Sequence, residues 1–194
     1  MAIAPEKQAN KIVTNILSLE EFLTLPETKP AREYIDGQIH QKAMPQGKHS
    51  TLQAELIMVI NQRAKPQQIA YAFPELRCTF AKRSLVPDIS VFEWEHIPLD
   101  EEGEPLNKIQ IPPDWLIEIL SPAQSPFLII DKISFALKHG TKLGWLIAPK
   151  ERHILTFQNN SLQSHQSMDI LPILEVFDNW QLSVQDVFNL LKFS

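Results

Sequence analysis

Two acidic residues stand in apolar stretches of the sequence, where an ionised carboxylate is costly. Asp88 lies in Val-Pro-Asp-Ile-Ser-Val-Phe, and Glu118 lies in Trp-Leu-Ile-Glu-Ile-Leu. In a buried strand, each carboxylate needs a cation, a hydrogen-bond network or a metal ion as compensation. Two acids from separate strands commonly hold one hard divalent cation through oxygen ligands, and such a cation activates water for attack on a phosphoryl group.

Either acid alone has a structural explanation that is as good as the functional one. A single acid at the end of a strand often caps a helix or pairs with a basic side chain. The presence of both, each in its own apolar stretch, favours a site built around Asp88 and Glu118.

The apolar stretches have the composition of β-strands. Trp115–Leu120 is interrupted only by Glu118, which is typical of a strand covered on both faces. A tight hairpin is expected over Tyr34–Lys42, with Asp36-Gly37 as its turn. The polar segment Glu93–Pro113 is expected to be a loop. Further strands are expected at Ile69–Phe73, Leu76–Ala81, Val86–Phe92, Leu143–Ala148 and Ile154–Phe157.

Helical patterns lie between and after these strands. The expected helices run from the Ser18 capping box to about Leu25, over His49–Arg63, over Pro126–His139, and over Val184–Leu191. The third helix begins at a Ser-Pro pair and ends before Gly140. We expect Leu128, Phe135 and His139 to face the sheet from it.

The order of the elements predicts an α/β fold in which a mixed central sheet is flanked by helices. At 194 residues, the chain is expected to form one domain over residues 18–194, preceded by a flexible leader at residues 1–17.

Composition narrows the class of protein. Hydrophobic residues make up 44% of the chain, yet no apolar run approaches the roughly 20 residues of a membrane-spanning helix. The polar start Met1–Asn10 shows no export signal, and the single Cys78 excludes an internal disulfide framework, so a cytoplasmic protein is expected. The net charge of −5 is unfavourable for nucleic-acid binding, although a local basic patch suffices.

An ordered set of motifs resembles one known family. The set contains Pro87-Asp88, then Glu118-Ile-Leu-Ser-Pro122, then Lys132, Gly140 and Trp145; upstream it contains Glu33-Tyr-Ile-Asp-Gly37, Met44-Pro45 and His49. This order, over about Glu33–Pro149, resembles the Uma2 (DUF820) family, a branch of the PD-(D/E)XK restriction-endonuclease-like superfamily. The resemblance implies a restriction-endonuclease-like fold and metal-dependent cleavage of phosphodiester bonds.

The resemblance also assigns roles to individual residues. Asp88 and Glu118 would be the metal carboxylates, binding one or two Mg²⁺ or Mn²⁺ ions. The usual third element is a lysine two positions after the glutamate, where this chain has Leu120. In chains similar to Uma2 the lysine lies on the following helix, where Lys132 stands; its alternative is an ordinary solvated lysine.

Two supporting residues follow from the same resemblance. Glu33 would add a ligand or hold a ligating water, with Glu55 as its rival on the neighbouring helix. His49 would contact phosphate or cap its helix. The chain departs from the family at Leu128, where many members have Asp, and at Ala136, where many have Tyr; Asp131 is a candidate to replace the missing charge.

Two functions therefore compete. The favoured one is a metal-dependent endonuclease acting on DNA through Asp88, Glu118 and Lys132, and the resemblance makes a homodimer reasonable because two strands need two sites. The alternative is a nuclease-like fold with weak or no catalysis that acts as a binding or assembly module. A basic rim around the Asp88–Glu118 cleft would favour the first, and an acidic rim would argue against it.

Overall fold

The structure is a computed structural model that describes residues 17–122, 124–159 and 161–193. Of the expected leader at residues 1–17, residues 1–16 lie outside the described residues. The first helix, α1 (Leu19–Thr24), starts with the predicted capping box. The Glu21 carboxylate accepts from the Ser18 amide at 2.8 Å, and the Ser18 hydroxyl accepts from the Glu21 amide at 3.1 Å.

The larger of two sheets has six strands in the order β10-β9-β8-β7-β6-β3. The strands are β3 (Ala70–Pro74), β6 (Ile89–Glu93), β7 (Trp115–Ile119), β8 (Leu143–Ala148), β9 (His153–Gln158) and β10 (Ser161–Gln166). Strands β7 and β8 are parallel, whereas the other neighbouring pairs are antiparallel. Helix α3 (Pro126–Lys138) makes the crossover that this parallel pair requires. The predicted mixed α/β sheet is thus confirmed.

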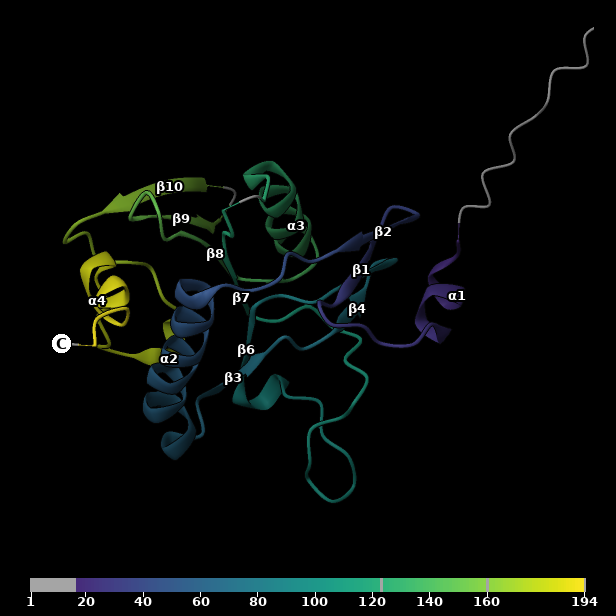
Figure 1. The fold of residues 1–194 in the computed structure, drawn as a ribbon. Coiled ribbons are helices and arrows are strands. Elements are labelled where there is room, and N and C mark those ends of the chain that lie inside the picture. The colour runs from purple at the N-terminus through teal and green to yellow at the C-terminus, as the bar shows by residue number, and fades with distance from the viewer. Residues whose placement is uncertain (1–16, 123, 160, 194) are drawn as a thin grey trace, which may run out of the picture.

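The smaller sheet has four strands in the order β2-β1-β5-β4. They are β1 (Arg32–Ile35), β2 (Gln38–Gln41), β4 (Cys78–Phe80) and β5 (Arg83–Leu85). The predicted turn at Asp36-Gly37 is confirmed, since both residues have positive φ angles, 50° and 84°. Figure 1 shows this sheet on the side of the molecule away from α2 and α4, next to α1.

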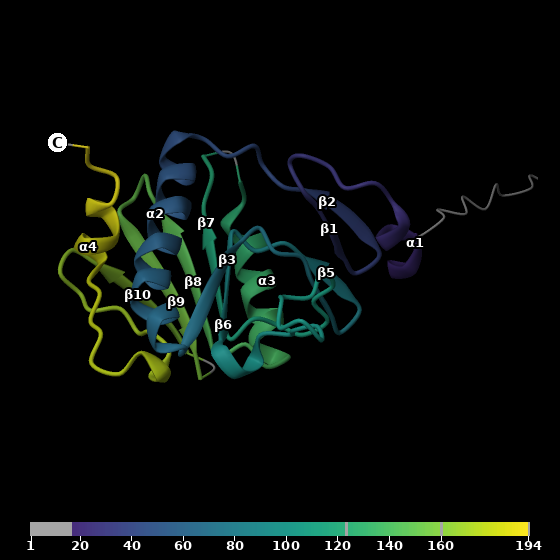
Figure 2. The same ribbon diagram turned by 90° about the horizontal axis from the view of Figure 1, so that it is seen from below.

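Helices cover both faces of the larger sheet (Figures 1 and 2). The long α2 (Gly47–Ala64) and the short α4 (Val184–Asn189) pack on one face, and α3 packs on the other. Strand β7 shows the consequence. Its residues Trp115, Ile117 and Ile119 enter the core under α2, while Leu116 enters the core under α3 together with residues of the smaller sheet. Alternation along the strand places Glu118 on the α3 face as well.

The expected face of α3 is wrong for Leu128 and His139, whereas Phe135 is half-buried and packs against the core as expected. Leu128 is 58% exposed and His139 is also exposed, whereas the buried positions are Ile129, Lys132, Ile133 and Ala136. This helix is apolar around much of its circumference, so spacing alone did not select the stripe. Gly144 of β8 fits the observed face, because its missing side chain leaves room for Ile133.

Two strands have no counterpart among the expected elements. Strand β5 is a three-residue segment, and β10 is a polar edge strand whose side chains are mostly exposed. The expected loop at residues 93–113 starts one residue early, because Glu93 ends β6; its other residues contain only the 3₁₀ turn Trp94–His96 and isolated bridges. Among the described helices, none is both long and apolar enough to cross a membrane.

Candidate active site

Asp88 and Glu118 lie side by side at one end of the larger sheet. Asp88 immediately precedes β6, which pairs with β7 so that Ile89 faces Ile117 across the two antiparallel strands. One step further in this register, Asp88 stands opposite Glu118, and the two side chains share the α3 face. Both residues are buried, with 2% and 1% of their surface exposed.

The Asp88 carboxylate is held by three donors. Its Oδ2 accepts from the Ile119 amide at 2.7 Å and lies 3.0 Å from Nε2 of His49. Its Oδ1 lies 2.6 Å from the ammonium of Lys42. Burial opposes ionisation, but Lys42 and His49 outweigh it and hold the pKa of Asp88 well below its usual range.

Lys42 is a site residue that the sequence reasoning missed. It follows β2, and its ammonium also donates to the backbone carbonyl of Val86 at 2.7 Å. Burial lowers the pKa of Lys42, but Asp88 and Glu118 raise it by more than burial lowers it, so the pKa lies above the usual value. The sequence offered only one signal, a lysine at the end of the expected hairpin, and nothing in that position indicates a partner at Asp88.

Glu118 shares the ammonium of Lys132 with Glu33. Nζ of Lys132 lies 2.7 Å from Oε1 of each carboxylate. The contact to Glu33 is a hydrogen bond, whereas the contact to Glu118 is an ion pair whose angles leave Oε1 of Glu118 without a hydrogen bond from the described residues. Burial, with a smaller contribution from Asp88, raises the pKa of Glu118 to about 7, although Lys132 opposes this.

Lys132 is therefore not a solvated helix lysine. It is 3% exposed, and the two carboxylates keep its pKa above the usual value although burial favours the neutral amine. Glu33 is buried on β1 and also accepts from the Val86 amide at 2.7 Å. Its rival Glu55 is half-buried on α2 and has no hydrogen bond or ion pair to these side chains among the described residues.

His49 lies in the first turn of α2 and faces Asp88. The N-cap position of that helix is Gln46, so the expected capping role for His49 is wrong. Its Nε2 is engaged with Asp88, while its buried Nδ1 has no hydrogen-bond partner among the described residues. The ring consequently orients one oxygen of the Asp88 carboxylate.

Asp131 does not replace the charge that is missing at Leu128. Its carboxylate points away from Glu118 and binds Arg83 at 2.9 Å, which also pairs with Asp36. These contacts tie α3 to the smaller sheet. The suggestion that Asp131 joins the site is wrong, because residue 131 lies one position from Lys132 and faces a different side of the helix.

The donor set suits a hard divalent cation. Two carboxylates lie next to each other, from Glu118 on β7 and from Asp88 directly before β6, and Oε1 of Glu118 contacts the Lys132 ammonium at 2.7 Å. Carboxylate oxygens are the ligands that Mg²⁺ and Mn²⁺ prefer. The surrounding Lys42, Lys132 and His49 compensate the acids inside the protein as well, so the cluster is held without a cation.

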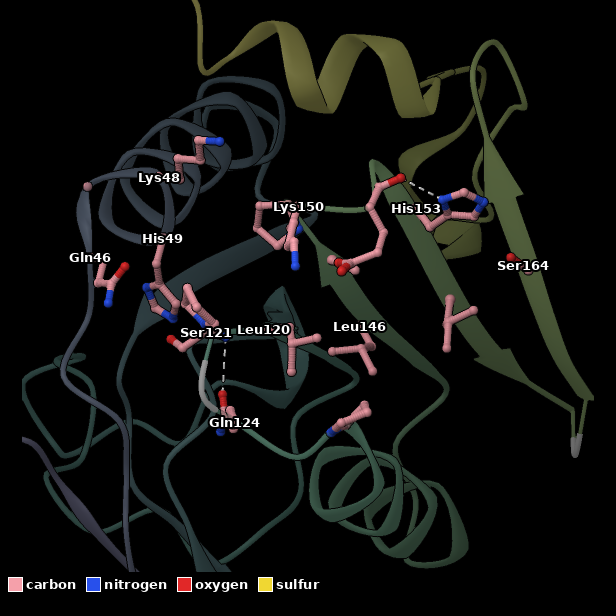
Figure 3. Close-up of a pocket in the computed structure, with 17 residues that line it drawn as sticks. Gln46, Lys48, His49, Leu120, Ser121, Gln124, Leu146, Lys150, His153 and Ser164 are labelled. Carbon is pink, nitrogen blue, oxygen red and sulfur yellow. Dashed lines mark hydrogen bonds between the residues drawn. The ribbon is translucent and has the colours of Figure 1, made fainter.

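A groove of about 900 Å³ borders the cluster through His49 and Leu120. Figure 3 shows Leu120 and Leu146 in its middle, between the start of α2 and the strands β8 to β10. The exposed Lys48 and Lys150 and the half-buried His153 line it, with Glu151 as its one lining acid among the described residues. The first turns of α2 and α3 also border this groove, and within the described chain neither helix has a capping side-chain hydrogen bond.

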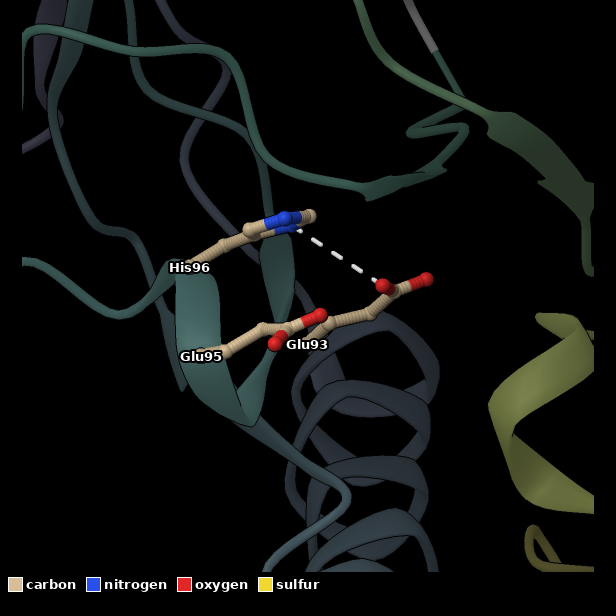
Figure 4. A group of neighbouring side chains, drawn as sticks. All are labelled: Glu93, Glu95 and His96. Atoms are coloured by element: carbon tan, nitrogen blue, oxygen red, sulfur yellow. Dashed lines mark ion pairs between the residues drawn. The ribbon is translucent and has the colours of Figure 1, made fainter.

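A second acidic group lies at the other end of β6. One ligand atom from each of Glu93, Glu95 and His96 falls within 4.8 Å of the others (Figure 4). Glu93 is already paired with Lys142 at 2.6 Å, and His96 lies 2.9 Å from Asp114. These contacts join the end of β6 to the residues directly before β7 and β8, which is a structural role.

Comparisons with known proteins agree with the resemblance found in the sequence. The model of the Uma2 family, described as "Putative restriction endonuclease", matches residues 19–185. A crystal structure of "a putative nuclease belonging to DUF820" from Anabaena variabilis ATCC 29413 is 49% identical, with a TM-score of 0.88. The match covers 90% of this chain and 99% of that one. No curated protein gives a significant match.

Proposed function

Because this chain belongs to the Uma2 family of restriction-endonuclease-like proteins, we propose that it is a metal-dependent endonuclease that hydrolyses phosphodiester bonds in DNA. One observation carries the proposal: Glu118 lies on β7, Asp88 directly precedes the neighbouring β6, and the register of the two strands, extended by one residue, sets these two buried acids opposite each other.

In this proposal Asp88 and Glu118 hold Mg²⁺ or Mn²⁺. Once bound, such an ion polarises the phosphoryl oxygen and lowers the pKa of water. His49 and the Ile119 amide fix the orientation of Asp88. Lys132, held by Glu33, keeps a positive charge beside Glu118, which favours its ionised form and suits a positioning role.

The groove beside the site supports DNA as the substrate. Lys48, Lys150 and the amide ends of two helices give it a positive rim, although the whole chain has a net charge of −5. Such a rim attracts a phosphate backbone without reading sequence. Cutting both strands of a duplex needs two active sites, so we also propose a homodimer.

The test is cleavage of supercoiled plasmid in Mg²⁺ or Mn²⁺. Wild type is expected to nick and linearise the plasmid, and EDTA is expected to stop it. Asp88→Asn keeps the shape of the side chain and should lose cleavage by at least about a hundredfold. Lys138→Met, which changes an exposed lysine of α3, serves as the control. Cleavage by Asp88→Asn at the wild-type rate would show that this pair is not the active site.

A second function has its own supporting observation. The lysine usually found after the glutamate is replaced by Leu120, and Lys42 and Lys132 already neutralise the acids. This arrangement suits a nuclease-like fold that binds DNA without cutting it. Fluorescence anisotropy with a labelled duplex distinguishes the two, because the binding module retains DNA affinity while plasmid stays intact in every metal tested.

A further inference from the structure

We propose that Lys42 is a displaceable counter-ion of this site, which holds Asp88 in the metal-free protein and turns toward the substrate phosphate when a divalent cation takes its place. The inference rests on the proposed function, because it assumes that Asp88 binds a cation. It assigns to Lys42 the contact with substrate phosphate that a lysine at position 120 would otherwise make, where this chain has Leu120.

The two oxygens of Asp88 are held differently. Oδ2 is fixed from within the fold by the Ile119 amide and His49. Among the described residues, Lys42 is the one hydrogen-bond partner of Oδ1, at 2.6 Å. A cation that binds Oδ1 therefore competes with the Lys42 ammonium, whereas the contacts to Oδ2 can remain.

The two site lysines differ in their freedom to move. Lys132 projects from the middle of α3 and faces two carboxylates at once. Lys42 follows β2, and the residues after it, 43–46, are exposed and lie outside any helix or strand. A lysine ammonium rides on a flexible four-carbon stem, so it can move by several ångströms without a backbone change. Its one further hydrogen bond among the described residues, to the carbonyl of Val86 at 2.7 Å, is to a neutral acceptor, so Lys42 faces one carboxylate where Lys132 faces two, and it is the ammonium that the site releases more readily.

The place to which it would turn is next to the groove. Gln46, at the end of the same connecting segment, and Leu120, which occupies the place of the usual strand lysine, both line that groove. Asp88 itself does not line the groove, but His49 does, and its Nε2 lies 3.0 Å from Oδ2 of Asp88, so a substrate strand in the groove would lie one side chain away from Asp88. An ammonium released there opposes the negative charge that develops during cleavage.

Binding of Mn²⁺ alone, measured by calorimetry at constant pH, tests the competition. Lys42→Met removes the competitor and leaves Asp88 without its ion pair, so its affinity should rise on the order of tenfold or more over wild type. Lys42→Gln, which retains a neutral donor, should fall between the two. Lys138→Met is the matched lysine control and should bind like wild type. Circular dichroism establishes that each variant is folded.

The outcomes separate this inference from the proposed function. If wild type binds Mn²⁺ and both folded Lys42 variants bind it equally or more weakly, the inference is overturned and the metal site remains. No binding by any protein overturns the metal site and the inference together. Plasmid cleavage gives the second readout: Lys42→Met should cut more slowly despite binding Mn²⁺ more tightly, and cutting at or above the wild-type rate would refute the role toward phosphate.

Discussion

Lys132 faces two carboxylates, so removing the lysine and removing one acid have different consequences. Without Lys132, Glu33 and Glu118 are left as neighbouring buried acids. Without the charge of Glu118, Lys132 keeps its hydrogen bond to Glu33. Burial already raises the pKa of Glu118 from 4.5 to about 7, so its ionisation lowers the stability of the fold as the pH rises from about 4.5 to about 7, and the whole loss is present at pH 8.

We therefore predict that Lys132→Met loses much more unfolding free energy than Glu118→Gln when both are unfolded with urea at pH 8 in EDTA. Lys132→Met should lose roughly 3–5 kcal/mol, because it leaves buried charges uncompensated. Glu118→Gln should stay within about 1 kcal/mol of wild type or exceed it, since a neutral isostere removes a buried charge. A greater loss in Glu118→Gln than in Lys132→Met would mean that Glu118, and not Lys132, is the structural partner.

Much of the candidate site is accessible from the sequence. Asp88 and Glu118 stand out because their neighbours are apolar, and the motif order adds Glu33, His49 and Lys132. The structure brings all five into one cluster. Lys42 was missed because its contact with Asp88 spans 46 residues and depends on the path of the segment after β2, which no local pattern encodes.

The position of Lys132 depends on how closely α3 packs against β8. A Cβ atom added to Gly144 would meet Cγ2 of Ile133 at 2.2 Å, and this atom belongs to a buried, branched side chain. A β-branched residue in a helix has one strongly preferred rotamer, so Ile133 has little room to yield. Gly144 thus sets the distance between the helix that supplies Lys132 and the sheet that supplies Glu118.

Gly144→Ala is expected to destabilise the protein by about 1–3 kcal/mol through overpacking. It should also weaken Mn²⁺ binding, because Lys132 moves with its helix. The matched control is Gly47→Ala at the start of α2, where an added Cβ meets nothing within 4 Å. Urea unfolding of both variants checks this, and equal stability for the two would show that α3 can shift freely.

At the level of elements, the sequence predicted the strands whose side chains are buried, because burial leaves an apolar or alternating pattern. The strands that became β3, β6, β7, β8 and β9 carry apolar or alternating patterns, and they were found near their true bounds. Strand β10 is a mostly exposed edge with Leu162 as its one apolar residue, so no alternating pattern marks it. The buried face of α3 is matched to residues of other elements, such as Gly144 of β8 opposite Ile133, and this tertiary information is not encoded in the helix sequence.

Cys78 reports on the integrity of the whole fold. Its thiol is buried between the smaller sheet and α3, and burial raises its pKa to about 12. Since an unfolded thiol ionises near pH 8.5, the fold should lose stability as the pH rises from there toward 12. We predict no reaction with a disulfide reagent at pH 8 until urea unfolds the protein. Fast labelling of the native protein would indicate opening of this core.

The charge of the whole molecule and the charge of the groove differ in sign. If the groove carries DNA, Lys48→Ala and Lys150→Ala should each weaken binding, and each should reduce the slope of log affinity against log salt by about 1. Fluorescence anisotropy in Ca²⁺ measures this, with Lys138→Ala as the control. An equal effect in all three variants would indicate diffuse charge in place of a groove.

The most direct measurement is an anomalous difference map from crystals soaked in Mn²⁺. The proposed site predicts one or two peaks that contact the carboxylates of Asp88 and Glu118, with Lys42 displaced from Oδ1 of Asp88. A peak at Glu93, Glu95 and His96 alone, or none at Asp88 and Glu118 in crystals that bind Mn²⁺ elsewhere, would contradict the central claim.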